Sequence, residues 1–520
     1  MPPAPPFIQA PTLSGPPLLR RISLDLRGRL PEPADYEDYA AGTVTLGDLI
    51  DRWSTDDNAP RMLAEAHRLI WRLNGRQMPD LERFAEAGEP GLSAALDAET
   101  RAAIIGEPIA IVRRSLANAE PYGSFFTSEG TVAPDRALDF WDVSPGAEEF
   151  EGEDISAAAW TDGRPAAGIL SAPGTYAALS GEGRSASPAR FSHLMARLLC
   201  ANYESRTAHE FVGIDISDMS DPATLSRTRA DCVSCHGSLE RGAGLLGGLG
   251  SPGSFTNWKN WTTPSGGPFA FSGRSFAGAR EFAEFLATDP RPRLCAAKGL
   301  FATLMQRPIF NDKDAEALTV GHRAFAANDW DLRSLAAEFV RTEDYRITPI
   351  PRTITGDRAT SVSGLRLLSR RHLSGLLGSL LPTGTSIAYP EELDPGTEEA
   401  AGTTFRMPSG TWFHHASRTI RVAVAAIVAA ELADSAAVED RKLLTELPAG
   451  NASGASSDAV AAQISAVWKT LAATDITAAN RTAFVEIFNA AGGNASAEAS
   501  RVSWNAVLIA ILLSPGVLNL

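Results

Sequence analysis

Four cysteines and one histidine carry the clearest chemistry in this chain of 520 residues. Two of the cysteines lie in the motif Cys232-Val233-Ser234-Cys235-His236, and the other two, Cys200 and Cys295, stand alone on either side of it. Cys-x-x-Cys-His is the attachment sequence of c-type haem, whose vinyl groups react with the two thiols. The histidine that directly follows is then the proximal ligand of the iron. The motif therefore predicts one covalent haem c, held by Cys232, Cys235 and His236.

Two other uses of the motif compete with haem. A structural zinc site takes four ligands, commonly from a second Cys or His pair at a modest distance, and the sequence offers no such pair. A thioredoxin-like redox motif needs a strand before it and a helix after it. Here polar residues 226–231 precede the motif, and glycine-rich residues 237–253 follow it. Zinc binding and thiol redox chemistry remain the alternatives to haem.

The group on the other side of the iron would decide how the haem reacts. A methionine there raises the reduction potential, a histidine lowers it, and an open position permits ligand or peroxide chemistry. Met219 is the first candidate, because the polar loop around it could fold over the cofactor. His193 is the second, and its spacing from Cys200 places both residues on one face of a predicted helix. The remaining candidates nearby are Met195, His209 and Met305. For each of them the competing interpretation is an ordinary core or surface residue.

Cys200 and Cys295 are predicted to form a disulfide. Haem attachment takes place outside the cytoplasm, and an oxidising compartment allows the two remaining thiols to bond. Such a bond would close a loop around the whole haem segment. The alternative is a pair of buried free thiols that behave as small apolar side chains.

The charge balance excludes one class of partner. The chain has 47 lysine and arginine residues against 62 aspartate and glutamate residues, which gives a formal net charge of −15. A protein this acidic repels the phosphates of nucleic acid, and no basic run offsets that field. No nucleic acid partner is expected. The partners that remain are a redox protein and other periplasmic or cell-surface proteins.

The apolar segments bear on membrane insertion and export. A bilayer span needs about 20 consecutive apolar residues, whereas the best candidates are the short residues 422–430 and 507–513. No transmembrane span is expected. The N-terminus, which begins Met1-Pro2-Pro3, has neither the basic nor the apolar region of a secretory signal. Because haem c is attached outside the cytoplasm, we expect a periplasmic or cell-surface protein whose native precursor has an export signal before residue 1.

Most of the chain has apolar residues three and four positions apart, which is the spacing of helices. Its 44% hydrophobic and 21% charged residues are typical of a globular protein. The predicted helices cover residues 48–74 with a break near Pro60, and residues 188–201, 280–287, 294–306, 312–327, 332–341, 364–380, 417–433, 457–472, 478–490 and 504–513. Residues 269–276 predict a small hairpin. The expected fold class is mainly α: multi-domain helical bundles with a small β-hairpin near the haem module.

The prediction divides the chain into five parts. An extended leader, residues 1–14, precedes an N-terminal helical domain, residues 15–160. The haem module covers residues 161–253. A helical module that packs on it covers residues 254–346. The boundary that follows is rich in proline and threonine, and it opens a C-terminal helical domain, residues 347–520.

Two helix endings resemble each other. Residues 332–345 and 507–518 both consist of an apolar helix, a short polar break and an apolar residue that could pack back on the helix. The likeness indicates either a duplicated helical module or two ordinary helix ends. A second feature is an aromatic group beyond the glycine-rich stretch, which either packs under a long loop or shields a haem edge. Its members are Phe255, Trp258, Trp261, Phe269, Phe271 and Phe276.

The order of several segments is similar to that in a known family. The haem motif, preceded by residues 167–173, Ser187-Pro188 and residues 198–200, resembles the haem-bearing module of the planctomycete-type multi-domain cytochrome c family. Other segments resemble neighbouring modules of that group: residues 18–26 with Leu30-Pro31, and residues 120–127, 271–278, 295–301 and 331–345. The resemblance thus extends over about residues 15–346 and implies an exported c-type cytochrome.

The chain departs from the family pattern directly after the haem motif. Such proteins usually have an Asp-Pro-Leu-Gly element that ends in a Glu-Asn pair, whereas Leu239-Glu240-Arg241-Gly242-Ala243-Gly244 stands here. Any haem contact made by that element is therefore not carried over.

The expected function is single-electron transfer by an exported monohaem c-type cytochrome. One alternative is a haem peroxidase or oxygenase with an open distal site, which would need an acid–base residue above the iron. Another is a surface or assembly protein in which the haem is auxiliary. The chain has no nucleophile elbow, phosphate loop or dinucleotide fingerprint that would indicate another enzyme class.

Overall fold

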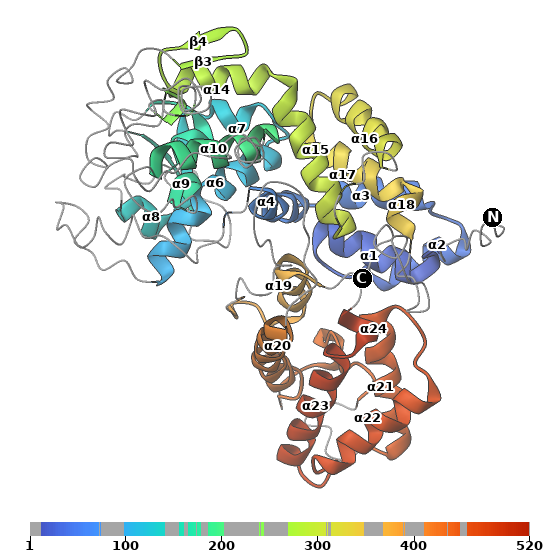
Figure 1. The fold of residues 1–520 in the computed structure, drawn as a ribbon. Coiled ribbons are helices and arrows are strands. Elements are labelled where there is room, and N and C mark those ends of the chain that lie inside the picture. Colours follow the sequence, from blue (N-terminus) through green and yellow to red (C-terminus); the bar gives the residue numbers. More distant parts are fainter. Residues whose placement is uncertain are drawn as a thin grey trace, which may run out of the picture.

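The computed structural model describes residues 12–71, 73, 98–140, 155–160, 165–172, 174–177, 186–201, 239, 241–243, 269–307, 309, 314–347, 368–387, 389, 410–433, 435–447 and 455–518. These residues are mostly helical, with two small two-stranded sheets (Figure 1). The mainly α fold class is therefore confirmed.

The elements up to residue 347 form what we call the first unit. Its helices are α1 (Gly15–Arg27), α2 (Pro33–Ala41), α3 (Leu46–Ser54), α4 (Ala59–Ile70), α6 (Ala98–Ala117), α7 (Ser124–Thr127), α8 (Asp135–Phe140), η1 (Gly168–Leu170), α9 (Gly174–Ala177), α10 (Ala186–Leu199), α14 (Ala279–Thr288), α15 (Pro290–Met305), α16 (Ala315–Ala327), α17 (Leu332–Arg341) and α18 (Glu343–Arg346). Its strands are β1 (Gly130–Pro134), β2 (Ile155–Ala159), β3 (Phe269–Phe271) and β4 (Arg274–Phe276).

The elements from residue 368 onward form the second unit. They are α19 (Arg370–Leu380), α20 (Gly410–Glu431), η6 (Val438–Asp440), α21 (Ser457–Ala472), α22 (Ala478–Ala490), α23 (Ala497–Leu512) and α24 (Pro515–Leu518). In Figure 1 they make up the orange and red part of the molecule, and α19 lies beside the first unit.

Capping residues explain where several helices begin and end. Prolines occupy the first turn of α1, and Gly28 ends that helix with a left-handed φ of 70°. The Thr45 side chain accepts a hydrogen bond from the backbone N–H of Asp48 at the start of α3. Pro60 lies in the first turn of α4. The predicted break near Pro60 is therefore confirmed as the gap between α3 and α4.

The predicted hairpin at residues 269–276 is confirmed. β3 and β4 pair antiparallel, with Phe269 opposite Phe276. Both residues of the connecting turn, Ser272 and Gly273, have positive φ angles of 52° and 74°, as a two-residue turn between twisted strands requires. The second sheet, in which β1 pairs antiparallel with β2, was not predicted.

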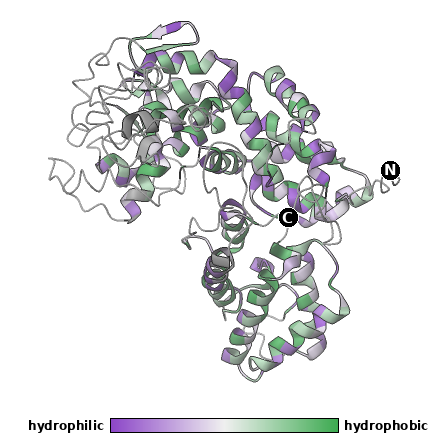
Figure 2. Ribbon diagram, viewed as in Figure 1, coloured by the Kyte–Doolittle hydropathy of each residue, from purple (hydrophilic) through white to green (hydrophobic). Residues whose placement is uncertain are grey.

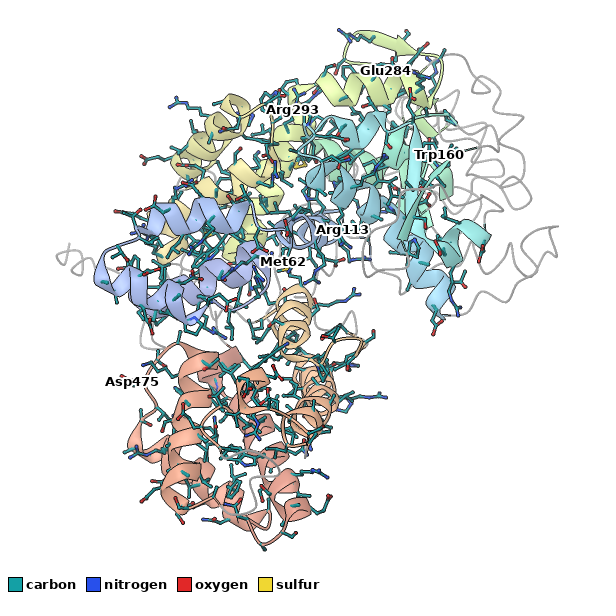
Figure 3. All side chains as sticks on the ribbon, turned by 180° about the vertical axis from the view of Figure 1, so that it is seen from behind. Met62, Arg113, Trp160, Glu284, Arg293 and Asp475 are labelled. Atoms are coloured by element: carbon teal, nitrogen blue, oxygen red, sulfur yellow. A yellow bond between two sulfur atoms is a disulfide. The ribbon has the colours of Figure 1, made fainter. Side chains whose placement is uncertain are left out.

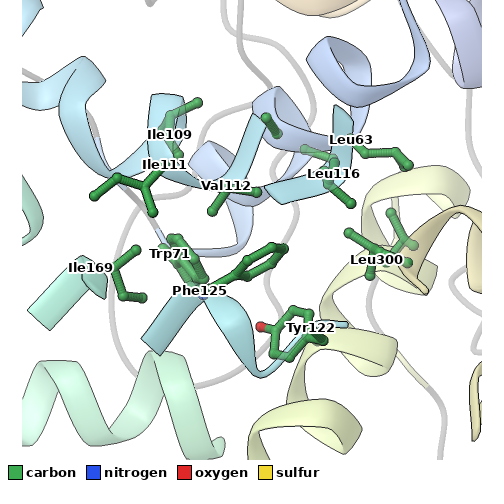
Figure 4. Close-up of a cluster of buried hydrophobic side chains, with 14 of the residues drawn as sticks. Leu63, Trp71, Ile109, Ile111, Val112, Leu116, Tyr122, Phe125, Ile169 and Leu300 are labelled. Atoms are coloured by element: carbon green, nitrogen blue, oxygen red, sulfur yellow. The ribbon is translucent and has the colours of Figure 1, made fainter. Parts of the chain in front are cut away.

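Buried apolar side chains form two clusters. Figure 2 colours the ribbon by hydropathy, and hydrophobic residues occur along the helices of both units. The first cluster runs from Leu18 to Tyr345 and takes residues from all three of the predicted parts within residues 15–346. Figure 4 shows its centre, where Trp71, Tyr122 and Phe125 meet aliphatic residues of α6. The second runs from Leu368 to Leu518 and also includes Leu24 of α1. Helix α1 therefore contributes to both clusters.

Figure 3 shows where labelled side chains lie relative to the junction of the two units. Met62 of α4 lies near the junction, whereas Glu284 and Arg293 lie on the far side of the first unit. No helix in the described part of the chain combines the length and apolar character that a membrane span requires.

Helices α15–α18 and α21–α24 follow the same succession. α15 and α21 each have 16 residues, and α16 and α22 each have 13. α15 and α21 both end at a non-glycine residue with positive φ, Gln306 at 48° and Ala473 at 55°. In each set the first helix contacts the second and third, and the third contacts the fourth.

The two sets also close in the same way. The backbone N–H of Leu13, just before α1, donates to the carbonyl of Arg346 at the end of α18, over 2.6 Å. The N–H of Leu368, just before α19, donates to the carbonyl of Leu518 at the end of α24, over 2.9 Å. This agreement favours a duplicated helical module over two unrelated helix ends.

Candidate functional site

The motif residues Cys232, Cys235 and His236 lie outside the described residues. The distal candidates Met219 and His209 also lie outside them. The structure therefore bears on the predicted haem site through the residues on either side of the motif and through the other two cysteines.

The predicted disulfide between Cys200 and Cys295 is confirmed. The two Cα atoms are 5.4 Å apart, within the range that a disulfide can bridge. Cys200 directly follows α10 and has a φ of 50°, the left-handed conformation that often ends a helix. Cys295 lies in α15 and is 4% exposed. The bond joins α10 to α15 and takes up both cysteines outside the motif.

This pairing leaves Cys232 and Cys235 as the cysteines for other chemistry. Two thiols followed directly by a histidine supply the two covalent attachments and the axial nitrogen that haem c requires. Within the described residues, no group of three or more His, Cys, Asp or Glu side chains is arranged to hold a metal ion. The donor set of the motif fits haem c.

The described residues after the motif pack on α10. Leu239 and residues 241–243 are helical, and Ala243 is buried in the first cluster. A Cβ atom added to Gly242 would lie 2.1 Å from Cε1 of Phe191, so only glycine fits against this ring. Phe191 belongs to α10, the helix that Cys200 directly follows. The chain thus leaves α10 before the motif and returns to the same helix after it.

An aromatic cluster surrounds Phe191. Its ring centroid is 5.0 Å from that of Phe269 and 6.2 Å from that of Phe282. Phe276 lies 5.3 Å from Phe282, and Phe271 packs on the same group from β3. Of the aromatic residues singled out in the sequence, Phe269, Phe271 and Phe276 therefore pack together, whereas Phe255, Trp258 and Trp261 lie outside the described residues.

The structure distinguishes the distal candidates that it describes. Met195 and Met305 are 1% and 0% exposed within the first apolar cluster, so their side chains belong to the core. His193 is half-buried on α10, seven residues before Cys200 and two residues after Phe191. The haem segment begins directly after this helix, and Gly242, which follows the motif, packs against it.

His67 is a buried histidine that the sequence did not single out. Its Nδ1 atom is 3.0 Å from the carbonyl oxygen of Leu63, to which it donates, and Nε2 has no hydrogen-bond partner. The rings of Trp71, Tyr122 and Phe125 surround it at centroid distances of 5.0, 5.8 and 5.9 Å. Burial lowers the pKa of His67 to about 4, so the imidazole is neutral at pH 7.

A buried polar network, here called the Asp25 network, joins the two units. The Asp25 carboxylate accepts hydrogen bonds from the Tyr345 hydroxyl (2.7 Å), Arg371 Nη2 (2.6 Å) and His372 Nε2 (2.9 Å). Nδ1 of His372 accepts from the backbone N–H of Ser369 over 3.1 Å. This pattern fixes the neutral tautomer of His372 that carries its proton on Nε2. α1, α18 and α19 therefore meet on one carboxylate.

Burial and charge determine the protonation of this network. Burial acts to raise the pKa of Asp25, but the hydrogen bond from His372 and the charges of Arg371 and Arg21 outweigh it and hold that pKa at about 2. Burial, assisted by the charge of Arg371, lowers the pKa of His372 to about 4. Burial and the neighbouring Asp25 raise the pKa of Tyr345 well above its usual range.

The network contains a Ser-His-Asp sequence of contacts that is not an active site. Ser369 Oγ lies 2.9 Å from His372 Nδ1, and His372 Nε2 lies 2.9 Å from Asp25. All three side chains are at most 3% exposed, and Ser369 is the N-terminal capping residue of α19. A substrate has no access to the hydroxyl, so the arrangement is structural.

Sequence reasoning missed this network because its members are far apart in the chain. Asp25 and His372 are separated by 347 positions. The available signal was the paired arginines, Arg20-Arg21 in the middle of α1 and Arg370-Arg371 at the start of α19.

Comparison of the chain with protein-family models, with curated proteins and with solved structures finds no match. The resemblance to the planctomycete-type cytochrome family therefore stays a prediction that rests on the segments quoted above.

Proposed function

We propose that this protein is an exported monohaem c-type cytochrome that transfers single electrons. The observation that carries the proposal is the division of the four cysteines. One pair forms a disulfide that joins α10 to α15, and the other pair stands in a Cys-x-x-Cys-His motif. The disulfide also supports an oxidising compartment, since such bonds are rare in reducing ones. That is the kind of compartment in which haem c is attached.

The supports around the motif fit a bound, rigid cofactor. Leu239 lies three positions after His236, a reach of about 11 Å at full extension. Gly242 is seated against Phe191, and Cys200 is bonded to α15. The closeness of His236 in sequence to Leu239 and Gly242 would keep its imidazole near α10. The phenylalanines around Phe191 would exclude water from that side.

Bound haem would supply one-electron iron chemistry, with His236 as proximal ligand. Cys232 and Cys235 would hold the group covalently. Met219 is proposed as the distal ligand and His193 as its alternative. The position of His193 on α10 is compatible with that role, because it lies between Phe191 and Cys200.

The covalent attachment is tested with full-length protein made in a host that carries a c-type cytochrome maturation system. We expect one haem per chain by intact mass under denaturing conditions and by the spectrum in alkaline pyridine. Cys232→Ser or Cys235→Ser should lose stable attachment. The matched control is the double variant Cys200→Ser with Cys295→Ser, which removes two cysteines and should keep the haem. A wild-type chain without a haem adduct, or with one bound zinc ion, contradicts the proposal.

The electron-transfer role is tested by ligand binding to the reduced haem protein. A six-coordinate iron should not change its absorption spectrum under carbon monoxide. Met219→Ala should then create carbon monoxide binding if Met219 is the distal ligand, and His193→Ala should do so if His193 is. Rapid binding by the wild type would contradict electron transfer through a six-coordinate haem and favour the peroxidase or oxygenase alternative.

A further inference from the structure

Two buried arginines lie close to one carboxylate at the junction of the units. Arg371 pairs directly with Asp25, and Arg21 stacks on Tyr345, whose hydroxyl donates to Asp25. Arg21 of α1 and Arg371 of α19 are 1% and 3% exposed. Asp25 accepts a hydrogen bond from Arg371 Nη2, and it also binds Tyr345 and His372. Buried charges in proteins are normally paired, because removing an ion from water is costly. Two guanidinium groups against one carboxylate leave a positive charge without a partner.

The hydrogen bonds of the network show which group carries the unpaired positive charge. His372 is neutral, since its Nδ1 accepts a hydrogen bond from Ser369 while its Nε2 donates to Asp25. The Tyr345 hydroxyl donates to Asp25 and is therefore protonated. Neither residue supplies a second negative charge. The excess lies on Arg21, which makes no hydrogen bond to Asp25.

The free atoms of Arg21 form one edge of its guanidinium group. Nε and Nη2 are both buried and both lack a hydrogen-bond partner. These two N–H groups point the same way and make the fork that binds carboxylate and phosphate oxygens in pairs. The ring of Tyr345 lies 3.9 Å from the guanidinium carbon and covers one face of the group. Stacking on Tyr345 holds the edge in a fixed plane.

We infer that this edge of Arg21 is a binding site for a small oxoanion at the junction of the two units. Two parallel donors 1% exposed to solvent match two oxygens of one acceptor, as in phosphate, sulfate or a small carboxylate. A halide offers one centre rather than two and fits the fork less well. Arg371 Nε, which is also buried without a partner, adds a further donor nearby. The ligand neutralises the excess charge and bridges α1 and α19.

A bound water is the competing occupant of the edge. Water would satisfy the donors but not the charge, and it would give no dependence on the type of anion. Binding measurements in solution therefore distinguish a bound oxoanion from a bound water. Neither occupant depends on the haem.

The test measures anion binding to the full-length protein. Equilibrium dialysis against radiolabelled sulfate, in chloride buffer of constant ionic strength, should show one saturable site per chain. Unlabelled phosphate and acetate serve as competitors, and the stronger competitor distinguishes an inorganic oxoanion from a carboxylate as ligand. The thermal midpoint should rise and saturate with the same anion. Absence of a saturable site in the wild type overturns the inference.

Matched variants assign the site. Arg21→Lys keeps the charge but removes the paired donors, and it should lose at least tenfold in affinity for sulfate. Tyr345→Phe removes one hydrogen bond to Asp25 but keeps a ring beneath Arg21, and it should retain the site. Equal sulfate binding by Arg21→Lys and wild type would overturn the assignment. If Arg21→Lys fails to fold, Arg21→Gln and the wild-type dialysis decide the question.

Discussion

At the scale of single residues, the Asp25 carboxylate determines how the two units meet. It receives hydrogen bonds from α18 and from two residues of α19, while its own backbone belongs to α1. A buried charge that loses its partners is more destabilising than the pair is stabilising. The arrangement therefore specifies one way of joining the units more strongly than it adds to their stability.

The buried histidines predict a dependence of stability on pH. The pKa values of His67 and His372 fall from 6.5 to about 4 on folding, chiefly because both are buried. Between about pH 6.5 and pH 4, these two histidines bind protons in the unfolded chain but not in the folded chain. Their stability contribution is therefore complete above about pH 6.5 and decreases as the pH falls to about 4, by about 3 kcal/mol for each histidine. Urea unfolding at several pH values between 7 and 4 measures this loss.

His67→Gln isolates one of the two contributions. The glutamine does not titrate, so the loss between pH 7 and 4 should shrink by about 3 kcal/mol. His414→Gln, a change on the exposed side of α20, is the control and should leave the pH dependence as in the wild type. The Asp25 contribution is a separate effect, because its pKa of about 2 places that loss below about pH 3.8. An unchanged slope in His67→Gln would refute this account.

At the scale of elements, two helices cross closely where α1 ends. A Cβ atom added to Gly375 of α19 would lie 2.1 Å from the carbonyl oxygen of Gly28, the capping residue of α1. An added Cβ at Gly378, one turn later, would meet nothing within 4 Å. The close approach brings Arg371 within reach of Asp25, since both lie beside this crossing. The helix thus uses one of its two glycines for packing.

This difference gives a paired prediction. Gly375→Ala should destabilise the protein by about 1–3 kcal/mol, because the added atom forces the backbones apart. Gly378→Ala should stabilise it by up to about 1 kcal/mol, because alanine is the better helix former. Denaturant unfolding at pH 7 of the two variants and the wild type measures both effects. Equal effects of the two alanines would show that the crossing is not tight in solution.

Element boundaries could be predicted where capping and spacing agree. α17, α21 and α22 have the bounds that apolar spacing predicts. α6 was not predicted, because Gly106 and Pro108 interrupt its pattern, although it runs unbroken from residue 98 to 117. Tertiary packing overrides those two local signals: Pro108 lies inside the helix, and Ile104 and Ile109 are buried in the first cluster. β1 and β2 were not predicted, because each has only five residues and the two paired strands are far apart in the sequence.

In the candidate site, too, one part could be predicted from the sequence and another part could not. The disulfide could be predicted because four cysteines, two of them in a motif, leave one pair. The Asp25 network could not, since arginine and histidine in a helix normally indicate a solvated face. Only the long-range arrangement turns Arg371 and His372 inward onto α1.

At the scale of the whole molecule, the two units are coupled although each has its own apolar cluster. Arg20 of α1 donates from Nε to the carbonyl of Leu471 over 2.5 Å and from Nη2 to the carbonyl of Val517 over 2.6 Å. Leu471 and Val517 belong to α21 and α24, the first and last helices of the set α21–α24. The N-terminal helix of the chain therefore holds the C-terminal helices in place.

The Cys200–Cys295 disulfide lies entirely within the first unit and closes a segment with a sequence separation of 95. In the chain-entropy model a loop of this size stabilises by about 4–5 kcal/mol. Reduction should therefore weaken the first unit directly. It should affect the second unit only through the contacts that α1 makes with it.

This asymmetry permits a test of the coupling. We expect the wild type to unfold in one calorimetric transition, and a reductant should move that whole transition to lower temperature. Arg20→Ala removes the bonds to Leu471 and Val517 and leaves their carbonyls buried without that donor, which weakens the junction. The variant should unfold in two transitions, of which only the one from the first unit responds to reductant.

Arg52→Ala is the matched control: its side chain is 54% exposed, it pairs with Asp35 inside the first unit, and it should keep a single transition. A single transition in Arg20→Ala that still moves as a whole with reductant would mean that the shared apolar contacts of α1, Leu24 among them, couple the units without Arg20.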